Sequence, residues 1–169
     1  MPKRAPSRSV DVFVEIPKGS RAKYELDKAT GRIRLDRVLF ASVHYPADYG
    51  FVTDTLGGDG DPLDALVVVE EPTFPGCIVP ARPIGTLLMR DEKGQDEKIL
   101  AVPVGDPRFD EVDALEDLAP HWLKEIETFF ATYKTLEGAA VELAGWRGAE
   151  MAWQLIEDSR VPGTAKAPR

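Results

Sequence analysis

The residues of this sequence with the clearest chemical potential are three aspartates in one short loop. Asp59, Asp61 and Asp64 lie in the stretch Asp59-Gly60-Asp61-Pro62-Leu63-Asp64, directly before the apolar run Ala65–Val69. Crowded carboxylates repel one another, and each raises the pKa of its neighbours unless a cation neutralises them. Ligands that are all oxygen select hard ions such as magnesium, calcium or manganese. The loop therefore favours a site for divalent metal ions.

Two other interpretations of this loop compete with a metal site for catalysis. Asp and Gly are the commonest turn residues, so the loop could be a solvated acidic turn. A calcium EF-hand would use Asp59, Asp61 and Glu70 as ligands. The EF-hand pattern fails at Leu63, which replaces a ligand, and at Asp64, which replaces the required glycine.

A second acidic group lies in a predicted hairpin turn, at Asp91, Glu92, Asp96 and Glu97. Viewed alone, this group is typical of a charged, solvated hairpin loop. Both acidic loops, however, lie at strand ends of the same expected barrel. Together they could bind several metal ions.

Cationic and phenolic side chains complete the set of candidate groups. Lys23 lies on an expected strand, Arg37 follows one, and Lys134 follows Tyr133 after an expected helix. The segment 45–50 is expected to be a constrained loop that carries two further tyrosines, Tyr45 and Tyr49. Taken singly, lysine and arginine are usually surface groups, and tyrosine usually lies in the core or at its rim.

The bulk properties limit the classes of protein that this sequence can encode. Its 169 residues suit one domain, residues 1–169, with 1–9 and 162–169 expected to be flexible tails. The formal net charge of −8 argues against a nucleic-acid binder, which needs a basic face. Cys77 is the single cysteine, so no internal disulfide is possible, and its apolar neighbours predict a buried, unreactive thiol.

The expected location of the protein is cytoplasmic. The basic N-terminus is not followed by the apolar region of a signal peptide. Apolar runs also fall short of the ~20 residues needed to span a bilayer, so no membrane association is expected.

Hydrophobic periodicity predicts strands in the first two thirds of the chain and helices in the last third. The fold class is α+β: a small closed five-stranded barrel with added hairpin strands and two C-terminal helices packed outside. The expected strands are Val10–Ile16, Lys23–Asp27, Arg32–Asp36, Ala65–Val69, Ile84–Met89, Lys98–Val104 and Val141–Leu143. An apolar stripe from Leu118 to Tyr133 predicts the first helix, and a second is expected over Ala149–Asp158.

These segments, in this order, resemble the family I soluble inorganic pyrophosphatases of the bacterial type. The resemblance covers Val12 to about Asp158. The matching segments are Glu15-Ile16-Pro17, Lys23-Tyr24-Glu25-Leu26-Asp27, Asp36-Arg37, Tyr45-Pro46-Ala47-Asp48-Tyr49-Gly50, Asp59-Gly60-Asp61-Pro62-Leu63-Asp64-Ala65, the run from Asp91 to Lys98, Phe129-Phe130-Ala131-Thr132-Tyr133-Lys134 and Gly145-Trp146.

The resemblance implies magnesium-dependent hydrolysis of pyrophosphate by direct attack of water, an OB-like barrel, and a homo-oligomer, usually a hexamer. Several magnesium ions are expected in each active site, with manganese or other divalent ions as possible substitutes. By similarity the metal ligands would be Glu15, Asp59, Asp64, Asp91 and Asp96, with Glu92 in support, and Asp61 would be the general base. The phosphates would be held by Lys23, Arg37, Tyr49, Lys98, Tyr133 and Lys134, with Glu25 and Tyr45 in support.

Two other functions compete with this one. A non-catalytic OB-type module that binds nucleic acid would show a basic groove with aromatic platforms, whereas the polar motifs here are acidic. A phosphoesterase of broader specificity would hydrolyse nucleotides or sugar phosphates with magnesium alone.

Overall fold

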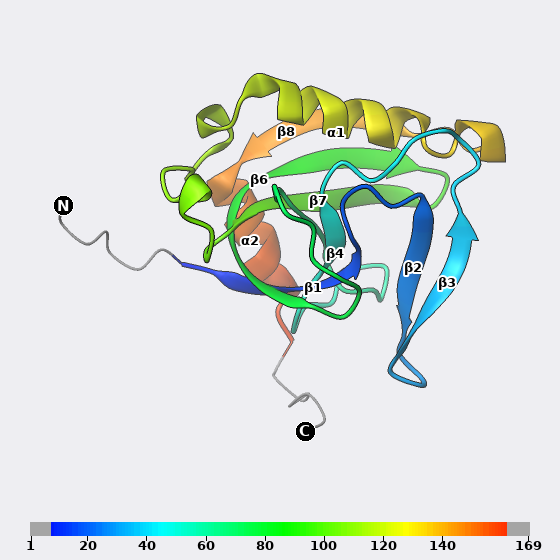
Figure 1. The fold of residues 1–169 in the computed structure, drawn as a ribbon, viewed down its shortest axis with the longest axis horizontal. Coiled ribbons are helices and arrows are strands. Elements are labelled where there is room, and N and C mark those ends of the chain that lie inside the picture. The colour runs from blue at the N-terminus through cyan, green and yellow to red at the C-terminus, as the bar shows by residue number, and fades with distance from the viewer. Residues whose placement is uncertain (1–7, 162–169) are drawn as a thin grey trace.

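The computed structural model describes residues 8–161, a mixed fold dominated by β-sheet with two α-helices (Figure 1). The segments 1–7 and 162–169, most of the two predicted tails, lie outside the described residues. The strands are β1 Val10–Ile16, β2 Ala22–Asp27, β3 Arg32–Val38, β4 Asp48–Val52, β5 Asp64–Val67, β6 Ile78–Asp91, β7 Gly94–Pro103 and β8 Glu142–Gly148. The helices are α1 Pro120–Thr132 and α2 Ala149–Ser159, with short 3-10 turns at Pro107–Phe109 (η1), Leu115–Asp117 (η2) and Thr135–Glu137 (η3).

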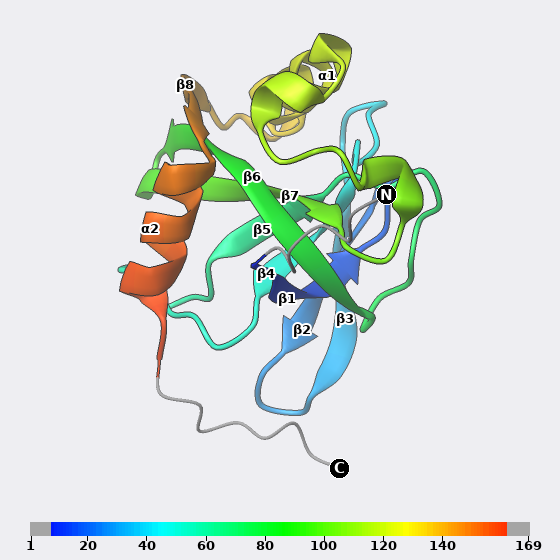
Figure 2. The same ribbon diagram turned by 90° about the vertical axis from the view of Figure 1, so that its left-hand side faces the viewer.

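Five strands, β1, β4, β5, β7 and β6, pair in a closed ring. The six-stranded sheet has the order β1-β4-β5-β7-β6-β8, and β6 also pairs with β1, which joins the two ends of a five-strand series (Figure 2). All of these pairs are antiparallel except β5 with β7, in which Ala65 lies opposite Ile99. The strand β8 extends the series beyond β6 as an edge.

The strand β5 is apolar on both faces because each face covers a different hydrophobic cluster. On β5, Leu66 belongs to a cluster that includes Ile126 and Phe130 of α1. Its neighbour Val67 points the other way, as successive strand residues must, into a cluster that includes Ile156 of α2. This double burial explains why the segment is a continuous apolar run instead of an alternating one.

β2 and β3 form a separate two-stranded sheet beside the ring (Figure 1). The two strands pair antiparallel from Ala22 opposite Val38 to Asp27 opposite Arg32, with a register shift between Lys23 and Tyr24. The turn that joins them ends at Gly31, whose φ of 71° lies in the left-handed region that glycine tolerates best. The alternating sequence and the turn residues predicted this hairpin correctly.

The helices and most strands lie where the periodicity predicted them, with different lengths. α1 begins at Pro120, since proline suits the first helical position, and buries the predicted stripe at Ile126, Phe129 and Phe130. Three strands extend beyond their predicted ranges: β6 starts earlier, at Ile78, β7 starts earlier, at Gly94, and β8 ends later, at Gly148.

The prediction of a loop over 45–50 was wrong in its second half, where β4 begins at Asp48. β4 is only five residues long and contains Gly50, which carries no strand signal of its own. The glycine is required by packing, since a Cβ at this position would lie 1.8 Å from the carbonyl oxygen of Phe13 on β1.

Two further expectations concern Cys77 and the membrane. The Cys77 side chain is only partly buried, so the predicted full burial was wrong; its neighbour Ile78 is 46% exposed at the start of β6.

Among residues 8–161, no helix has the length and apolar character needed to cross a bilayer.

Candidate active site

A polar pocket of about 780 Å³ lies where the β2–β3 hairpin, the ring and the C-terminal end of α1 meet. Thirteen of the fifteen predicted site residues line it, so segments far apart in the sequence converge as expected. These residues are Glu15, Lys23, Glu25, Arg37, Tyr49, Asp59, Asp61, Asp64, Asp91, Asp96, Lys98, Tyr133 and Lys134.

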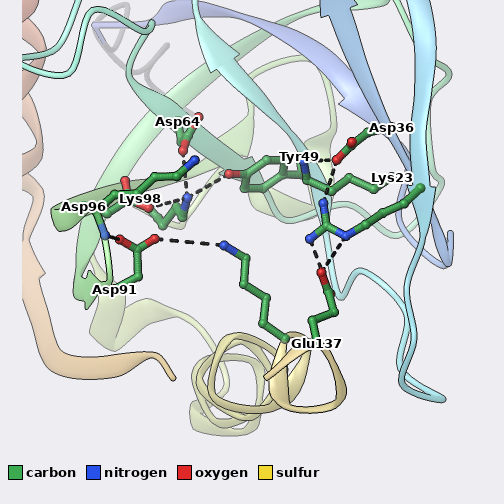
Figure 3. Close-up of polar contacts among 11 residues, drawn as sticks. Lys23, Asp36, Tyr49, Asp64, Asp91, Asp96, Lys98 and Glu137 are labelled. Atoms are coloured by element: carbon green, nitrogen blue, oxygen red, sulfur yellow. Dashed lines mark hydrogen bonds and ion pairs between the residues drawn. The ribbon is translucent and has the colours of Figure 1, made fainter. Parts of the chain in front are cut away.

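The buried side chain at the centre of the pocket is Lys98, on β7. Its Nζ donates hydrogen bonds to Asp64 Oδ2 at 2.7 Å and to the Tyr49 hydroxyl at 2.8 Å, and it lies 2.8 Å from Asp96 Oδ2 (Figure 3). Burial would lower the pKa of Lys98, but Tyr49, Asp64 and Asp96 outweigh it and hold the pKa well above its usual range. Lys98 is therefore a fixed positive charge between two carboxylates.

Two carboxyl groups of the pocket are harder to ionise than usual. Burial raises the pKa of Glu15 to about 7, against a hydrogen bond that its Oε2 accepts from the Leu26 N–H at 2.8 Å. Burial also raises the pKa of Asp96, although the nearby Lys98 opposes that change. Withdrawing a carboxylate from water without enough positive charge costs free energy, which is the physical cause in both cases.

A cationic wall faces these carboxylates. Lys23 Nζ donates to Asp36 Oδ2 at 2.9 Å, and Arg37 Nη1 donates to the same oxygen at 2.6 Å. From the opposite side, Lys134 Nζ lies 4.0 Å from Asp91 Oδ2 (Figure 3). Lysine and arginine side chains from a strand hairpin and from a helix end are thus aimed into one space.

The structure also places three charged residues in the pocket for which no role was predicted: Lys28, Asp36 and Lys93. Lys28 Nζ lies 3.5 Å from Asp61 Oδ1 across the pocket mouth. Lys28 and Lys93 occupy turns, where lysine is normally solvated, so residue type marked neither of them. Lys93 lies inside the matching run from Asp91 to Lys98, which was the available signal for it. Asp36 stood inside the matching pair Asp36-Arg37, and this adjacency was the available signal.

Two predicted residues lie outside the lining. Tyr45 is buried behind the pocket, with its ring centroid 5.4 Å from that of Tyr49 and 4.6 Å from that of Phe129. Burial raises the pKa of Tyr45, which keeps its hydroxyl neutral. Glu92 lies at the tip of the β6–β7 hairpin and lines a neighbouring cavity of about 560 Å³.

The pocket carries more negative than positive groups. Eight acidic side chains line it against six basic ones, so a fully ionised pocket repels anions unless cations are added. Its oxygen-rich donor set fits hard divalent ions. Within residues 8–161, no three His, Cys, Asp or Glu side chains are grouped closely enough to hold a metal ion, so the convergence of Asp59, Asp64 and Asp96 on one ion stays a prediction.

The chain is similar to known proteins over nearly its whole length. The family model described as inorganic pyrophosphatase matches residues 12–161. An inorganic pyrophosphatase of Methanosarcina acetivorans is 54% identical over 149 residues, which cover 88% of this chain and 89% of that protein. An inorganic pyrophosphatase of Streptomyces coelicolor is 55% identical over 150 residues, which cover 88% of this chain and 92% of that protein. The crystal structure of the inorganic pyrophosphatase from Thermus thermophilus superposes with a TM-score of 0.87 at 42% identity, covering 93% of this chain and 91% of that one.

Proposed function

Because this chain belongs to the inorganic pyrophosphatase family, we propose that it hydrolyses pyrophosphate by direct attack of a water molecule, with several magnesium ions held by its aspartates. Family membership makes it a hydrolase that converts pyrophosphate to two phosphates. The ions and the roles of individual residues are the proposed part.

The observation that carries the proposal is the charge of the pocket. Pyrophosphate is a small and highly charged anion, and here it would meet eight acidic side chains and six basic ones. Such a pocket attracts the substrate only when added cations reverse its charge. The raised pKa values of Glu15 and Asp96 support this, since burial of both carboxylates is not offset by the positive charge of the neighbouring side chains.

The proposed metal ligands are all carboxylates at the pocket. We assign Asp59, Asp64, Asp91 and Asp96 to magnesium, with Glu15 and Glu92 in support. When bound there, magnesium supplies positive charge to the phosphates and lowers the pKa of a coordinated water. Manganese or another divalent ion would satisfy the same oxygen ligands, with magnesium preferred for its small size.

Asp61 is the proposed general base. Its side chain is 74% exposed and its only ion pair described by the structure, with Lys28, spans 3.5 Å. The carboxylate is therefore accessible to a water molecule and can orient that water and accept its proton. No serine or cysteine nucleophile is assigned, because attack by water needs none.

The basic wall and the tyrosines are proposed to bind the phosphates. Arg37 can engage two oxygens at once, whereas lysines donate single contacts to a charged oxygen. The residues assigned to this role are Lys23, Arg37, Tyr49, Lys98, Tyr133 and Lys134, with Glu25 and Tyr45 in support. Phosphoryl transfer needs charge neutralisation and alignment more than covalent chemistry, which suits such a set.

Four broader features of the protein are part of the proposal. The closed pairing of β1, β4, β5, β7 and β6 supports an OB-like barrel. We also propose that residues 1–169 are one domain, that the protein is cytoplasmic, and that it assembles as a homo-oligomer, a hexamer by family resemblance. Light scattering on the purified protein tests the assembly.

Phosphate release from pyrophosphate is the decisive assay. We expect release with magnesium and none after the addition of a chelator, with recovery when magnesium is restored in excess. Adenosine triphosphate and glucose 6-phosphate serve as control substrates, and an oligonucleotide serves as the control ligand. Turnover that survives the chelator would overturn the metal proposal. Efficient hydrolysis of the control substrates with magnesium alone would show a broader phosphoesterase, and oligonucleotide binding without phosphate release would show a binding module.

A further inference from the structure

We propose that Glu137 is a positioning residue, which orients the Arg37 guanidinium for binding a phosphate group of the substrate. Glu137 belongs to none of the matching sequence segments and does not line the 780 Å³ pocket. The inference rests on the proposed role of Arg37 as a phosphate ligand, and it adds a residue that acts on the substrate only through Arg37.

The contacts between the two side chains fix the guanidinium along one edge. Glu137 Oε1 lies 2.8 Å from Arg37 Nε, and Oε2 accepts a longer hydrogen bond from Nη2 at 3.4 Å. The Nε atom is buried and makes no hydrogen bond of good geometry, so the 2.8 Å approach is an ion contact. Asp36 accepts from Nη1 at 2.6 Å on the other side (Figure 3).

These contacts leave the guanidinium with free donors in a useful arrangement. Each terminal nitrogen of arginine carries two N–H groups, and the hydrogen bonds to Asp36 and Glu137 use one on each. Among the residues that the structure describes, no other side chain is bonded to Nη1 or Nη2, so each keeps one N–H for an incoming anion. Two N–H groups on adjacent nitrogens form the fork that pairs with two oxygens of a phosphate group.

The position of Glu137 in the fold allows it to act across the pocket. Asp36 lies next to Arg37 on β3, so it moves with the hairpin and cannot fix the hairpin to anything else. Glu137 instead comes from η3, the turn that follows Tyr133 and Lys134. Its backbone N–H donates to the Lys134 carbonyl at 3.0 Å, which holds Glu137 one turn beyond the pocket-lining Lys134. The contact between Arg37 and Glu137 thus joins the β2–β3 hairpin, which carries Arg37, to the segment after α1, which carries Lys134.

A carboxylate so near an anion site has a cost that argues for a specific role. Its negative charge repels the phosphates, and a partly exposed ion pair contributes little stability by itself. The Glu137 side chain is 17% exposed and that of Arg37 is 25% exposed, so the pair is neither fully buried nor freely solvated. The orientation of Arg37 for phosphate binding offsets this repulsion. Glu137 can provide that benefit only while Arg37 is present.

A double-mutant cycle tests this proposal, with kcat, KM and Tm measured for Glu137→Gln, Arg37→Ala and the double variant. Glu137→Gln keeps the shape of the side chain and removes its charge. We expect kcat/KM to fall about tenfold in Glu137→Gln, since a hydrogen-bonded charge has been lost. In the Arg37→Ala background the same change should leave kcat/KM unchanged or raise it, because only the repulsion is left to remove. Glu142→Gln, an exposed glutamate on β8, is the matched control and should resemble the wild type.

The outcomes separate this inference from the proposed function. Full activity of Arg37→Ala would refute Arg37 as a phosphate ligand, and the inference would fall with it. Impaired Arg37→Ala together with wild-type Glu137→Gln would overturn the inference alone. If Glu137→Gln lowers Tm, the cycle still decides, because a folding defect multiplies the loss seen in Arg37→Ala, whereas an orientation effect does not.

Discussion

At the scale of single residues, Glu15 shows the free-energy cost of burying a carboxyl group in the pocket. Its carboxyl lies under the hairpin, bonded to the Leu26 N–H, and burial raises its pKa from 4.5 to about 7. Between these two values the folded chain binds more protons than the unfolded chain. The free energy of unfolding therefore falls as pH rises through this window.

Glu15→Gln should remove this pH dependence. As pH rises from about 5 to 8, we expect the free energy of unfolding of the variant to increase by roughly 1–3 kcal/mol relative to that of the wild type. A tenfold change in proton affinity on folding corresponds to about 1.4 kcal/mol. Urea unfolding in a chelating buffer measures the difference. A constant difference between the two proteins across this range would mean that Glu15 ionises in the fold as easily as in water.

Asp61→Asn is the residue-scale test of the general base. We expect kcat to fall by about two decades or more, in line with general-base contributions of ~10²–10⁴, while magnesium binding measured by calorimetry is retained. Asp11→Asn, exposed on β1 outside the pocket, is the control for a changed charge. Normal turnover in Asp61→Asn would require another base.

Thirteen of the fifteen predicted site residues line one pocket, as expected from matching motifs and residue chemistry that point to the same side chains, and their individual roles stay predictions. The sequence could not reveal pairings between strands, such as that of Lys98 with Asp64, since this contact depends on β5 and β7 being neighbours. Glu137 was missed for the same reason. A glutamate in a polar turn is typical of a solvated surface, and only the fold brings it to Arg37, 100 residues earlier in the chain.

At the scale of elements, β4 determines where Tyr49 meets Lys98. β4 lies antiparallel to β1 and so close to it at Gly50 that a Cβ there would lie 1.8 Å from the carbonyl oxygen of Phe13 and 2.8 Å from its carbonyl carbon. Backbone atoms cannot move aside as a flexible side chain can. The absence of a side chain at Gly50 thus permits the close spacing of β1 and β4 on which the position of Tyr49 depends.

Gly50→Ala should destabilise the protein by about 3 kcal/mol or more, because the added methyl must push two paired strands apart. Gly58→Ala is the control, since a Cβ at Gly58 would meet no atom within 4 Å. Thermal unfolding of the two variants gives the comparison. Equal Tm values would mean that β1 and β4 separate without cost.

The sequence predicted helices and strands correctly where a hydrophobic pattern extends over many residues, and it missed them where the pattern is short or interrupted. The 13 residues of α1 and the β2–β3 hairpin have clear patterns, and both were placed correctly. β4 spans five residues and includes Gly50, so its strand character comes from pairing with β1 and β5, not from its own residues. The first residues of β6 were missed because Pro80 and Pro83 interrupt the strand pattern.

At the scale of the whole molecule, the chain is acidic, with a formal net charge of −8. Part of this excess lies in the pocket, where eight acidic side chains oppose six basic ones. Divalent ions that bind the folded chain and not the unfolded one will stabilise the fold by mass action.

Magnesium at about 100 times its dissociation constant should therefore raise Tm by roughly 5 °C or more, equivalent to ~2.7 kcal/mol. Sodium chloride at equal ionic strength is the control for simple screening, and Asp64→Asn should reduce the magnesium effect. Equal changes in Tm with both salts would count against specific ion binding.

The separate β2–β3 sheet has a consequence for the dynamics of the pocket. Within residues 8–161, each of its strands is paired only with the other, whereas β6 pairs with β1, β7 and β8. Backbone amides of β2 and β3 should accordingly exchange with deuterium sooner than those of β6, through local opening that leaves the ring intact. Lys23 and Arg37 lie on this sheet, so an anion that binds them should also slow the exchange of its amides.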